Sequence, residues 1–173
     1  MIYIFSAIFL YLFLGLLLFI FQRRIVFNKS GHPGLPKDYD LNNTEQVFIK
    51  TGDGINLLSW YHQGDKKLPL LVYFHGNSFH IGDRAYRIKK YINKNWNVLL
   101  ISWRGFGGND GYPTEKNLYI DGEAVLKWIK EKTNFELDHT IIYGESLGSG
   151  VAVELGTKYN FLSIVLEAPF TSI

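Results

Sequence analysis

A run of apolar residues near the start of the chain most restricts what it can fold into. From Ile2 to Phe21 there is no charged side chain, and every Lys, Arg, Asp and Glu lies at or beyond Arg23. At about 1.5 Å per residue, such a helix is roughly 30 Å long, which matches the hydrocarbon core of a bilayer. A soluble helix of this length usually has a polar face. The run therefore predicts a membrane anchor over residues 1–22.

A cleaved signal peptide and a buried core helix are the alternatives to the anchor. No Lys or Arg precedes the run, no small-residue cleavage site follows it, and it is longer than the usual apolar segment of about 7–15 residues in a signal peptide. The nearest positive charges, at Arg23, Arg24 and Lys29, lie on its C-terminal side, and such charges tend to stay in the cytoplasm. We therefore expect a single-pass protein with the lipid bilayer as a partner and the remaining residues in the cytoplasm.

The composition changes after the apolar run. Residues 28–38 are rich in Pro, Gly and polar residues, so we expect a juxtamembrane linker over residues 23–39 and a folded domain over residues 40–173. The aromatic fraction of 16% supplies enough large apolar side chains for a packed core. A net charge of +2 argues against nucleic-acid binding, and the lack of cysteine excludes disulfides and thiolate nucleophiles.

The expected domain begins with two strand-like segments, 46–49 and 55–61, joined by the hairpin signal Thr51-Gly52-Asp53-Gly54. Four short apolar runs follow, which is typical of strands buried on both faces of a parallel sheet. These runs are 70–74, 98–103, 139–143 and 161–166, with helical apolar spacing in 81–92, 118–129 and after Ser146. The order predicts an α/β fold with a mostly parallel sheet, right-handed crossovers and an antiparallel start.

The strongest chemical signal is the pentapeptide Gly144-Glu145-Ser146-Leu147-Gly148. This G-x-S-x-G pattern lies between a predicted strand and a predicted helix, where a strained turn exposes a serine nucleophile. Glycines let the strand and helix approach closely, and the N–H of Leu147 would point toward a developing oxyanion. We expect Ser146 to be the nucleophile; a glycine-rich structural turn is the alternative.

A second signal is His75-Gly76-Asn77, which follows the predicted strand 70–74. Its loop can supply another oxyanion donor, the N–H of Asn77, whereas His75 fits a structural role better than that of a catalytic base. The other histidines, at positions 32, 62, 80 and 139, are isolated, and none has the H-x-x-x-H spacing of metal ligands. The glycine-rich loop 104–111 lacks the Lys-Ser/Thr of a phosphate-binding loop. The sequence predicts no metal site, and the expected chemistry needs no cofactor.

Taken together, the motifs resemble the α/β-hydrolase superfamily, and most of all its membrane-anchored ABHD-type serine hydrolases, which are related to the serine aminopeptidase-like branch. The resemblance covers about residues 40–173 and rests on segments 75–77, 103–107, 144–148 and 167–172. It implies an α/β-hydrolase fold with Ser146 as nucleophile and Leu147 and Asn77 as oxyanion-hole donors. It also implies that the strand before Ser146 lies between strands 70–74 and 161–166. The loop 77–80 is bulkier than in relatives, which often have small residues there.

The catalytic triad of this superfamily runs Ser, then Asp or Glu, then His along the chain. Residues 147–173 contain no Asp and no His, and neither Glu154 nor Glu167 is placed as the acid should be. We therefore expect the N-terminal part of a serine hydrolase that cleaves an ester, thioester or amide. Its acid and base would be lost or supplied by a separate C-terminal hydrolase fragment, and the run 161–166 would become an exposed apolar sheet edge.

The alternative function is a membrane-tethered, non-catalytic α/β-hydrolase-like binding module that uses its open sheet edge to recruit another chain. The sequence does not specify the substrate of the hydrolase, which would be a small molecule or an acylated group near the membrane.

Overall fold

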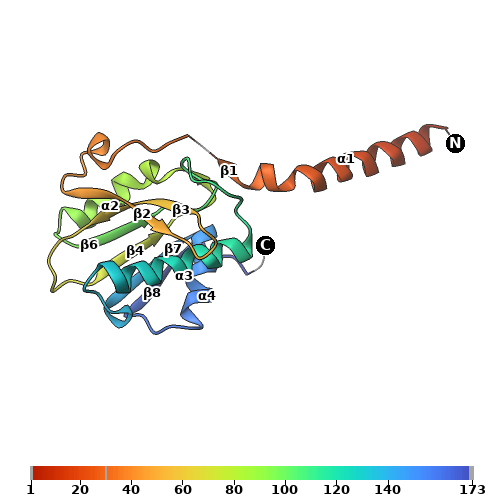
Figure 1. Cartoon of the computed structure of the whole chain (residues 1–173). Coiled ribbons are helices and arrows are strands. Elements are labelled where there is room, and N and C mark those ends of the chain that lie inside the picture. Colours follow the sequence, from red (N-terminus) through yellow and green to blue (C-terminus); the bar gives the residue numbers. More distant parts are fainter. Residues whose placement is uncertain (1, 30, 172–173) are drawn as a thin grey trace.

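The computed structural model describes residues 2–29 and 31–171, so Ser172 of the predicted terminal motif lies outside the described residues (Figure 1). The long helix α1 (Ile2–Val26) projects from an α/β domain. The strands of the main sheet are β2 (Thr44–Lys50), β3 (Asn56–His62), β4 (Leu70–Phe74), β6 (Asn97–Ile101), β7 (Thr140–Glu145) and β8 (Ser163–Glu167). The helices are α2 (Ala85–Ile92), α3 (Glu115–Lys132) and α4 (Leu147–Gly156), and 3-10 turns form η1 (Pro36–Tyr39), η2 (Ile81–Arg84) and η3 (Leu137–His139).

Helix α1 extends four residues beyond the predicted anchor, to Val26. Its apolar window Tyr3–Gln22 has a mean hydropathy of 2.8, and none of this window is buried. Within the described ranges it is the one helix whose length and composition would allow it to cross a membrane, a property that N-terminal signal sequences share.

The main sheet has the strand order β2-β3-β6-β4-β7-β8. Strand β3 is antiparallel to both β2 and β6, and the other neighbouring strands are parallel. The predicted hairpin turn is present, because Gly54 N–H donates to the carbonyl of Thr51 at 3.0 Å. The predicted mostly parallel sheet with an antiparallel start is therefore confirmed, as is the position of β7 between β4 and β8.

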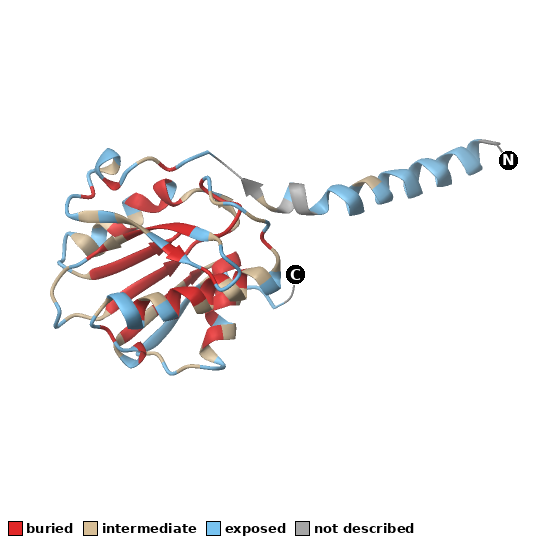
Figure 2. Ribbon diagram, viewed as in Figure 1, coloured by how far each residue is buried: buried red, intermediate tan, exposed pale blue. Residues whose placement is uncertain are grey.

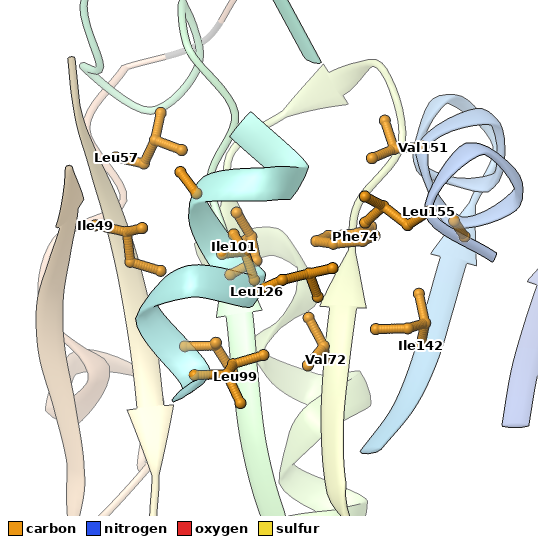
Figure 3. Packing of buried hydrophobic residues seen from close by; sticks show 14 of the residues in the cluster. Ile49, Leu57, Val72, Phe74, Leu99, Ile101, Leu126, Ile142, Val151 and Leu155 are labelled. Atoms are coloured by element: carbon orange, nitrogen blue, oxygen red, sulfur yellow. The ribbon is translucent and has the colours of Figure 1, made fainter. Parts of the chain in front are cut away.

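Helices cover both faces of the sheet (Figure 2). On β4, Val72 and Phe74 point to a cluster that contains residues of α3 and α4 (Figure 3), whereas Leu71 and Tyr73 point to a cluster with residues of η2 and α2. All five residues of β4 are buried, as are all five of β6. Burial on both faces explains why these strands appear in the sequence as uninterrupted apolar runs.

The two edges of the described sheet differ in polarity. Strand β2 has polar residues at both ends, including Glu45 and Lys50, whereas β8 has Ile164, Val165 and Leu166 in succession. These three residues remain 38–39% exposed. The expected exposed apolar edge is present among the described residues.

The segment predicted as a linker lies against the domain. Phe27 packs edge to face on Phe106, with 6.4 Å between the ring centroids. The short strand β1 (Asn28–Lys29) pairs in parallel with β5 (Ser78–Phe79), in the loop that follows β4. Farther along, the Tyr39 hydroxyl donates to the carbonyl of Pro33 at 2.7 Å. The residues after α1 are thereby connected to the edge of the sheet where β4 ends.

Candidate active site

Ser146 occupies a sharp turn between β7 and α4. Its backbone angles are φ 47° and ψ −110°, a conformation that costs a non-glycine residue about 1–3 kcal/mol. Hydrogen bonds hold this turn on both sides. The N–H of Ser146 donates to the carbonyl of Glu167 at 2.8 Å, and the carbonyl of Ser146 accepts from the Ser149 hydroxyl at 2.6 Å.

The glycines on either side of Ser146 are needed for the close approach of α4 to the sheet. A Cβ atom on Gly144 would lie 2.7 Å from the carbonyl oxygen of Gly148, and one on Gly148 would lie 2.1 Å from that of Phe74. Both obstacles are backbone atoms, which cannot move aside by a rotamer change. The steric reason proposed from the sequence for these glycines is confirmed.

The loop after β4 reaches the Ser146 turn. Strands β4 and β7 are parallel neighbours with Phe74 opposite Gly144, so their loops leave the sheet at the same edge. A Cβ atom on Gly76 would lie 3.4 Å from the Cβ of Ser146. The structure therefore brings together the two motifs that the sequence singled out.

Leu147 and Asn77 both lie at this edge of the sheet. Leu147 is the first residue of α4, and its N–H donates to no other residue of the described chain. The N-terminus of a helix leaves such groups unpaired and favours negative charge. Asn77 lies in the loop after β4, where its side-chain oxygen accepts a hydrogen bond from the Ser78 hydroxyl at 3.4 Å.

His75 is buried, and both of its ring nitrogens contact the backbone. Nδ1 donates to the carbonyl of Gly76 at 2.6 Å, and Nε2 accepts from the N–H of Trp103 at 3.5 Å. Burial, together with the positive charge of Arg84, lowers the pKa of His75 to about 4, so the ring is neutral at pH 7. The structural role expected for His75 is confirmed.

The other four histidines lie in separate surroundings. His80 Nδ1 is 3.0 Å from Asp83, His62 contacts Thr44, His32 accepts from Gly34, and His139 stacks on Phe135. No hydrogen bond joins the side chain of Ser146 to another described residue. Among the described residues, no histidine is therefore in hydrogen-bond contact with Ser146.

The two glutamates considered as the catalytic acid form ion pairs with other residues. Glu154 lies within α4 and pairs with Lys158 at 2.8 Å, whereas the Glu167 carboxylate contacts Arg87 and the Tyr143 hydroxyl. Within residues 2–29 and 31–171, no group of three or more His, Asp and Glu side chains is arranged to hold a metal ion.

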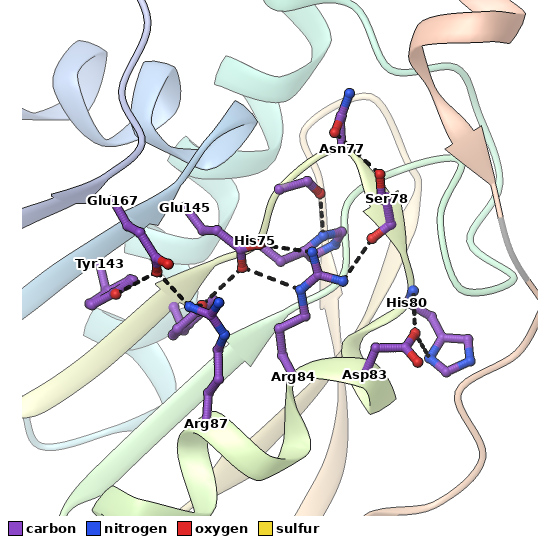
Figure 4. Close-up of polar contacts among 12 residues, drawn as sticks. His75, Asn77, Ser78, His80, Asp83, Arg84, Arg87, Tyr143, Glu145 and Glu167 are labelled. Carbon is purple, nitrogen blue, oxygen red and sulfur yellow. Dashed lines mark hydrogen bonds and ion pairs between the residues drawn. The ribbon is translucent and has the colours of Figure 1, made fainter.

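Arg84 and Glu145 form an ion pair at the site that the sequence analysis missed (Figure 4). Nη2 of Arg84 lies 2.9 Å from Oε1 of Glu145, and Nε lies 3.2 Å from Oε2, which also accepts from the Tyr73 hydroxyl at 2.9 Å. Burial opposes ionisation of Glu145, but the hydrogen bonds and charge of Arg84 prevail and hold the pKa of this carboxyl below its usual value. The two residues are 61 positions apart, and nothing in their sequence context indicated the pairing.

A second buried ion pair holds the loop after β6. The Arg104 guanidinium contacts the buried carboxylate of Asp121 in α3 at 2.6 Å and that of Asp53 in the hairpin turn at 2.7 Å. This glycine-rich loop therefore uses its arginine to join three elements of the fold. The sequence analysis noted the loop but not these partners.

Comparisons with known proteins agree with this geometry. A family model described as alpha/beta hydrolase fold matches residues 69–171. The chain is 32% identical over 166 residues to an uncharacterized protein of Mycobacterium tuberculosis, covering 92% of this chain and 58% of that protein. It is 30% identical over 169 residues to alpha/beta hydrolase domain-containing protein WAV2 of Arabidopsis thaliana, covering 91% of this chain and 54% of the relative.

The structure is also similar to that of the Pyrococcus furiosus esterase Pf2001, with a TM-score of 0.69 and 23% identity over 82% of this chain and 58% of the esterase. At this identity the likeness concerns the fold. The chain spans little more than half the length of each of these three proteins. The matched region includes both the loop after β4 and the Ser146 turn. The resemblance seen in the motifs is confirmed, and the chain belongs to the alpha/beta hydrolase family.

Proposed function

We propose that this chain carries the nucleophile and the oxyanion hole of a serine hydrolase. The observation that supports this most directly is the conformation of Ser146, a non-glycine residue at positive φ between β7 and the N-terminus of α4. Such a turn presents the hydroxyl at the carboxyl edge of the sheet. No hydrogen bond to another described residue occupies this hydroxyl.

In the proposed reaction, Oγ of Ser146 attacks the carbonyl carbon of an ester, thioester or amide while a base accepts its proton. The N–H groups of Leu147 and Asn77 would stabilise the resulting oxyanion. The base then protonates the leaving group, which departs as the acyl-enzyme forms, and water hydrolyses that intermediate by the reverse sequence of proton transfers.

We further propose that the acid and the histidine base come from polypeptide outside the described residues. His75 is held by backbone contacts and the other histidines lie elsewhere, so the described residues offer Ser146 no base. The greater length of the matched relatives supports the same view. Without its base, a serine nucleophile loses several orders of magnitude in rate.

Labelling with a fluorophosphonate probe tests both proposals. We expect weak labelling of residues 1–173 alone, and strong labelling when they are fused to the C-terminal segment of the Mycobacterium relative that lies beyond the match. Ser146→Ala should abolish the signal, whereas Ser163→Ala, which alters an exposed serine on β8, should not. Labelling that persists in Ser146→Ala contradicts the assignment of the nucleophile, and efficient labelling of the isolated chain contradicts the external base.

We also propose that α1 is a single membrane span and that the domain lies in the cytoplasm, with the bilayer as a partner. The hydropathy of the window Tyr3–Gln22 supports the span, and the positive residues after it support the orientation. The proposed substrate, a small molecule or an acylated group, would then be met near the membrane.

A non-catalytic binding module remains the second candidate, because β8 exposes an apolar edge to which another chain could add a strand. This candidate predicts that neither the chain nor the fusion is labelled and that the β8 edge alone recruits a partner.

A further inference from the structure

Arg84 links the two segments of the candidate oxyanion hole through a backbone carbonyl in one and a side chain in the other. It is the last residue of η2, and only 9% of it is exposed. Nη1 donates to the carbonyl of Ser78 at 2.8 Å, while Nη2 and Nε donate to the Glu145 carboxylate at 2.9 and 3.2 Å (Figure 4). One planar group thus bridges the loop after β4 and the last residue of β7.

The two partners of Arg84 are neighbours in sequence of the proposed oxyanion donors. Ser78 directly follows Asn77, and Glu145 directly precedes Ser146, which Leu147 follows. The guanidinium is therefore bonded to residues adjacent to both segments that carry the proposed donors. The geometry is well defined, because a bidentate arginine–carboxylate pair fixes the orientation of both groups.

The pair is shielded from water. Only 11% of the Arg84 side chain and 15% of the Glu145 side chain are exposed, so the contact is stronger than an ordinary surface ion pair. The Tyr73 hydroxyl holds the same carboxylate from β4 at 2.9 Å. The carboxylate therefore has little freedom to follow the loop if the loop moves.

The loop itself is in a conformation that needs support. Phe79 has a φ of 64°, which is unfavourable for a bulky residue and persists only where surrounding contacts hold it. The hydrogen bond from Arg84 to the carbonyl of Ser78 fixes the backbone of the residue directly before Phe79. A Cβ atom on Gly76 would lie 3.2 Å from Oε1 of Glu145 and 3.6 Å from Nη2 of Arg84, so this glycine leaves room for the pair.

We infer that Arg84 is a positioning residue that sets the spacing between the oxyanion donors of the β4 loop and the Ser146 turn. This inference rests on the proposed function, because it assigns Asn77 and Leu147 to one oxyanion. A misplacement of about 1 Å in a catalytic constellation can reduce the rate by roughly 100-fold. Arg84 would act through that spacing without touching the substrate.

Arg87 offers a matched control on the same side of the sheet. Its guanidinium also pairs with a glutamate, Glu167, and contacts the Tyr73 hydroxyl, but no contact joins it to the loop 75–79 among the described residues. Arg87→Gln therefore removes a more exposed arginine–glutamate pair and leaves the bridge between the two segments in place.

The test compares the wild-type chain with Arg84→Gln, Arg84→Lys and Arg87→Gln, each fused to the C-terminal segment used for labelling. Fluorophosphonate labelling gives a rate constant and a final labelled fraction, and hydrogen exchange is measured on peptides covering residues 75–80 and 145–149. We expect Arg84→Gln to label about 10- to 100-fold more slowly than Arg87→Gln, with a similar final labelled fraction under conditions in which both proteins are folded. Arg84→Lys should recover little of the rate, because an ammonium group cannot form the same planar bridge. Both peptides should exchange faster in the two Arg84 variants.

An Arg84→Gln protein that labels as fast as Arg87→Gln and exchanges normally in both peptides overturns the inference. So does a loss confined to the final labelled fraction, because that pattern reports fewer folded molecules and not a displaced donor. Failure of the wild-type fusion to label, or labelling of Ser146→Ala, counts against the proposed function only. The exchange of the two peptides then decides whether Arg84 holds the segments together.

Discussion

Gly148 illustrates how a single missing methyl group determines the position of Ser146. The Cα of this residue faces the carbonyl of Phe74 so closely that α4 could not begin where it does with any other residue there. Because Phe74 ends the central strand β4, that carbonyl is fixed by the ladders on both sides. The strain at Ser146 is therefore maintained by packing between neighbouring backbones.

We expect Gly148→Ala to lower the free energy of unfolding by about 3 kcal/mol, at the upper end of the range for overpacked cores, because the obstacle is backbone. Chemical denaturation followed by the fluorescence of the buried Trp60 and Trp103 measures this change. Gly52→Ala is the matched control, since nothing lies within 4 Å of the position that its new methyl group would take, and it should change stability by less than about 0.5 kcal/mol. Equal effects of the two substitutions would contradict the steric argument.

His75 makes stability depend on pH. Its pKa is about 4 in the folded chain and near 6.5 in the unfolded chain, so between these values the unfolded state binds a proton that the folded state does not. Stability is therefore complete above about pH 6.5, falls as the pH drops toward 4, and levels off below that value. The buried His62, whose pKa is also lowered by burial, contributes in the same direction.

We expect the contribution of His75 to this loss to be about 3 kcal/mol between pH 7 and pH 4. Denaturation midpoints at several pH values should show a shallower dependence in His75→Gln than in the wild-type chain. His32→Gln, which alters an exposed histidine, should keep the wild-type dependence. A His75→Gln variant with an unchanged slope would show that the imidazole already takes up its proton in the folded state.

The regular elements were predictable because their local sequence reflects burial. Strands covered on both faces appear as continuous apolar runs, and Thr51–Gly54 marks the hairpin. Strands β1 and β5 were not predicted, since two residues are too few to show a period. At the site, the turn of Ser146 and the loop of His75 followed from motifs, whereas the partner of Arg84 did not. An ion pair between distant residues leaves no local pattern.

Strand β8 should cause self-association of the chain. Its exposed apolar side chains lie on the edge of the described sheet, and unpaired edges of this kind join other strands. We expect Val165→Lys to reduce oligomers of the detergent-solubilised chain, as measured by sedimentation velocity, with little change in stability. Phe48→Lys, on the opposite edge strand β2, places the same charge at an exposed apolar position and should leave association unchanged. Equal oligomerisation in both variants and the wild type would exclude β8 as the contact.

Considered as a whole, the molecule has two unlike parts, an exposed apolar helix and a compact α/β domain. They are joined closely, because β1 pairs with β5 only two residues after α1 ends. The proposed membrane span would therefore hold the candidate site near the bilayer as well as attach the chain to it.

We expect the chain to remain in the membrane fraction after alkaline carbonate extraction and deletion of residues 2–22 to release it. Leu14→Arg, near the middle of the apolar window, should weaken insertion, since arginine costs about 2.5–3.5 kcal/mol at the centre of a span. Phe48→Arg makes a comparable substitution in the domain and should not alter the distribution. Extraction of the wild-type chain by carbonate would contradict the proposed span.

The pairing of β1 with β5 also limits how far the site can be from a bilayer. Asn28, which is paired with Ser78, lies six positions after Gln22, the end of the apolar window. Even fully extended, six residues reach only about 20 Å. If α1 spans a bilayer as proposed, the residue next to Asn77 is held within that height above the lipid. The proposed hydrolase would then meet its substrate by lateral diffusion in a thin layer over the membrane, and molecules free in the bulk would reach it only by entering that layer.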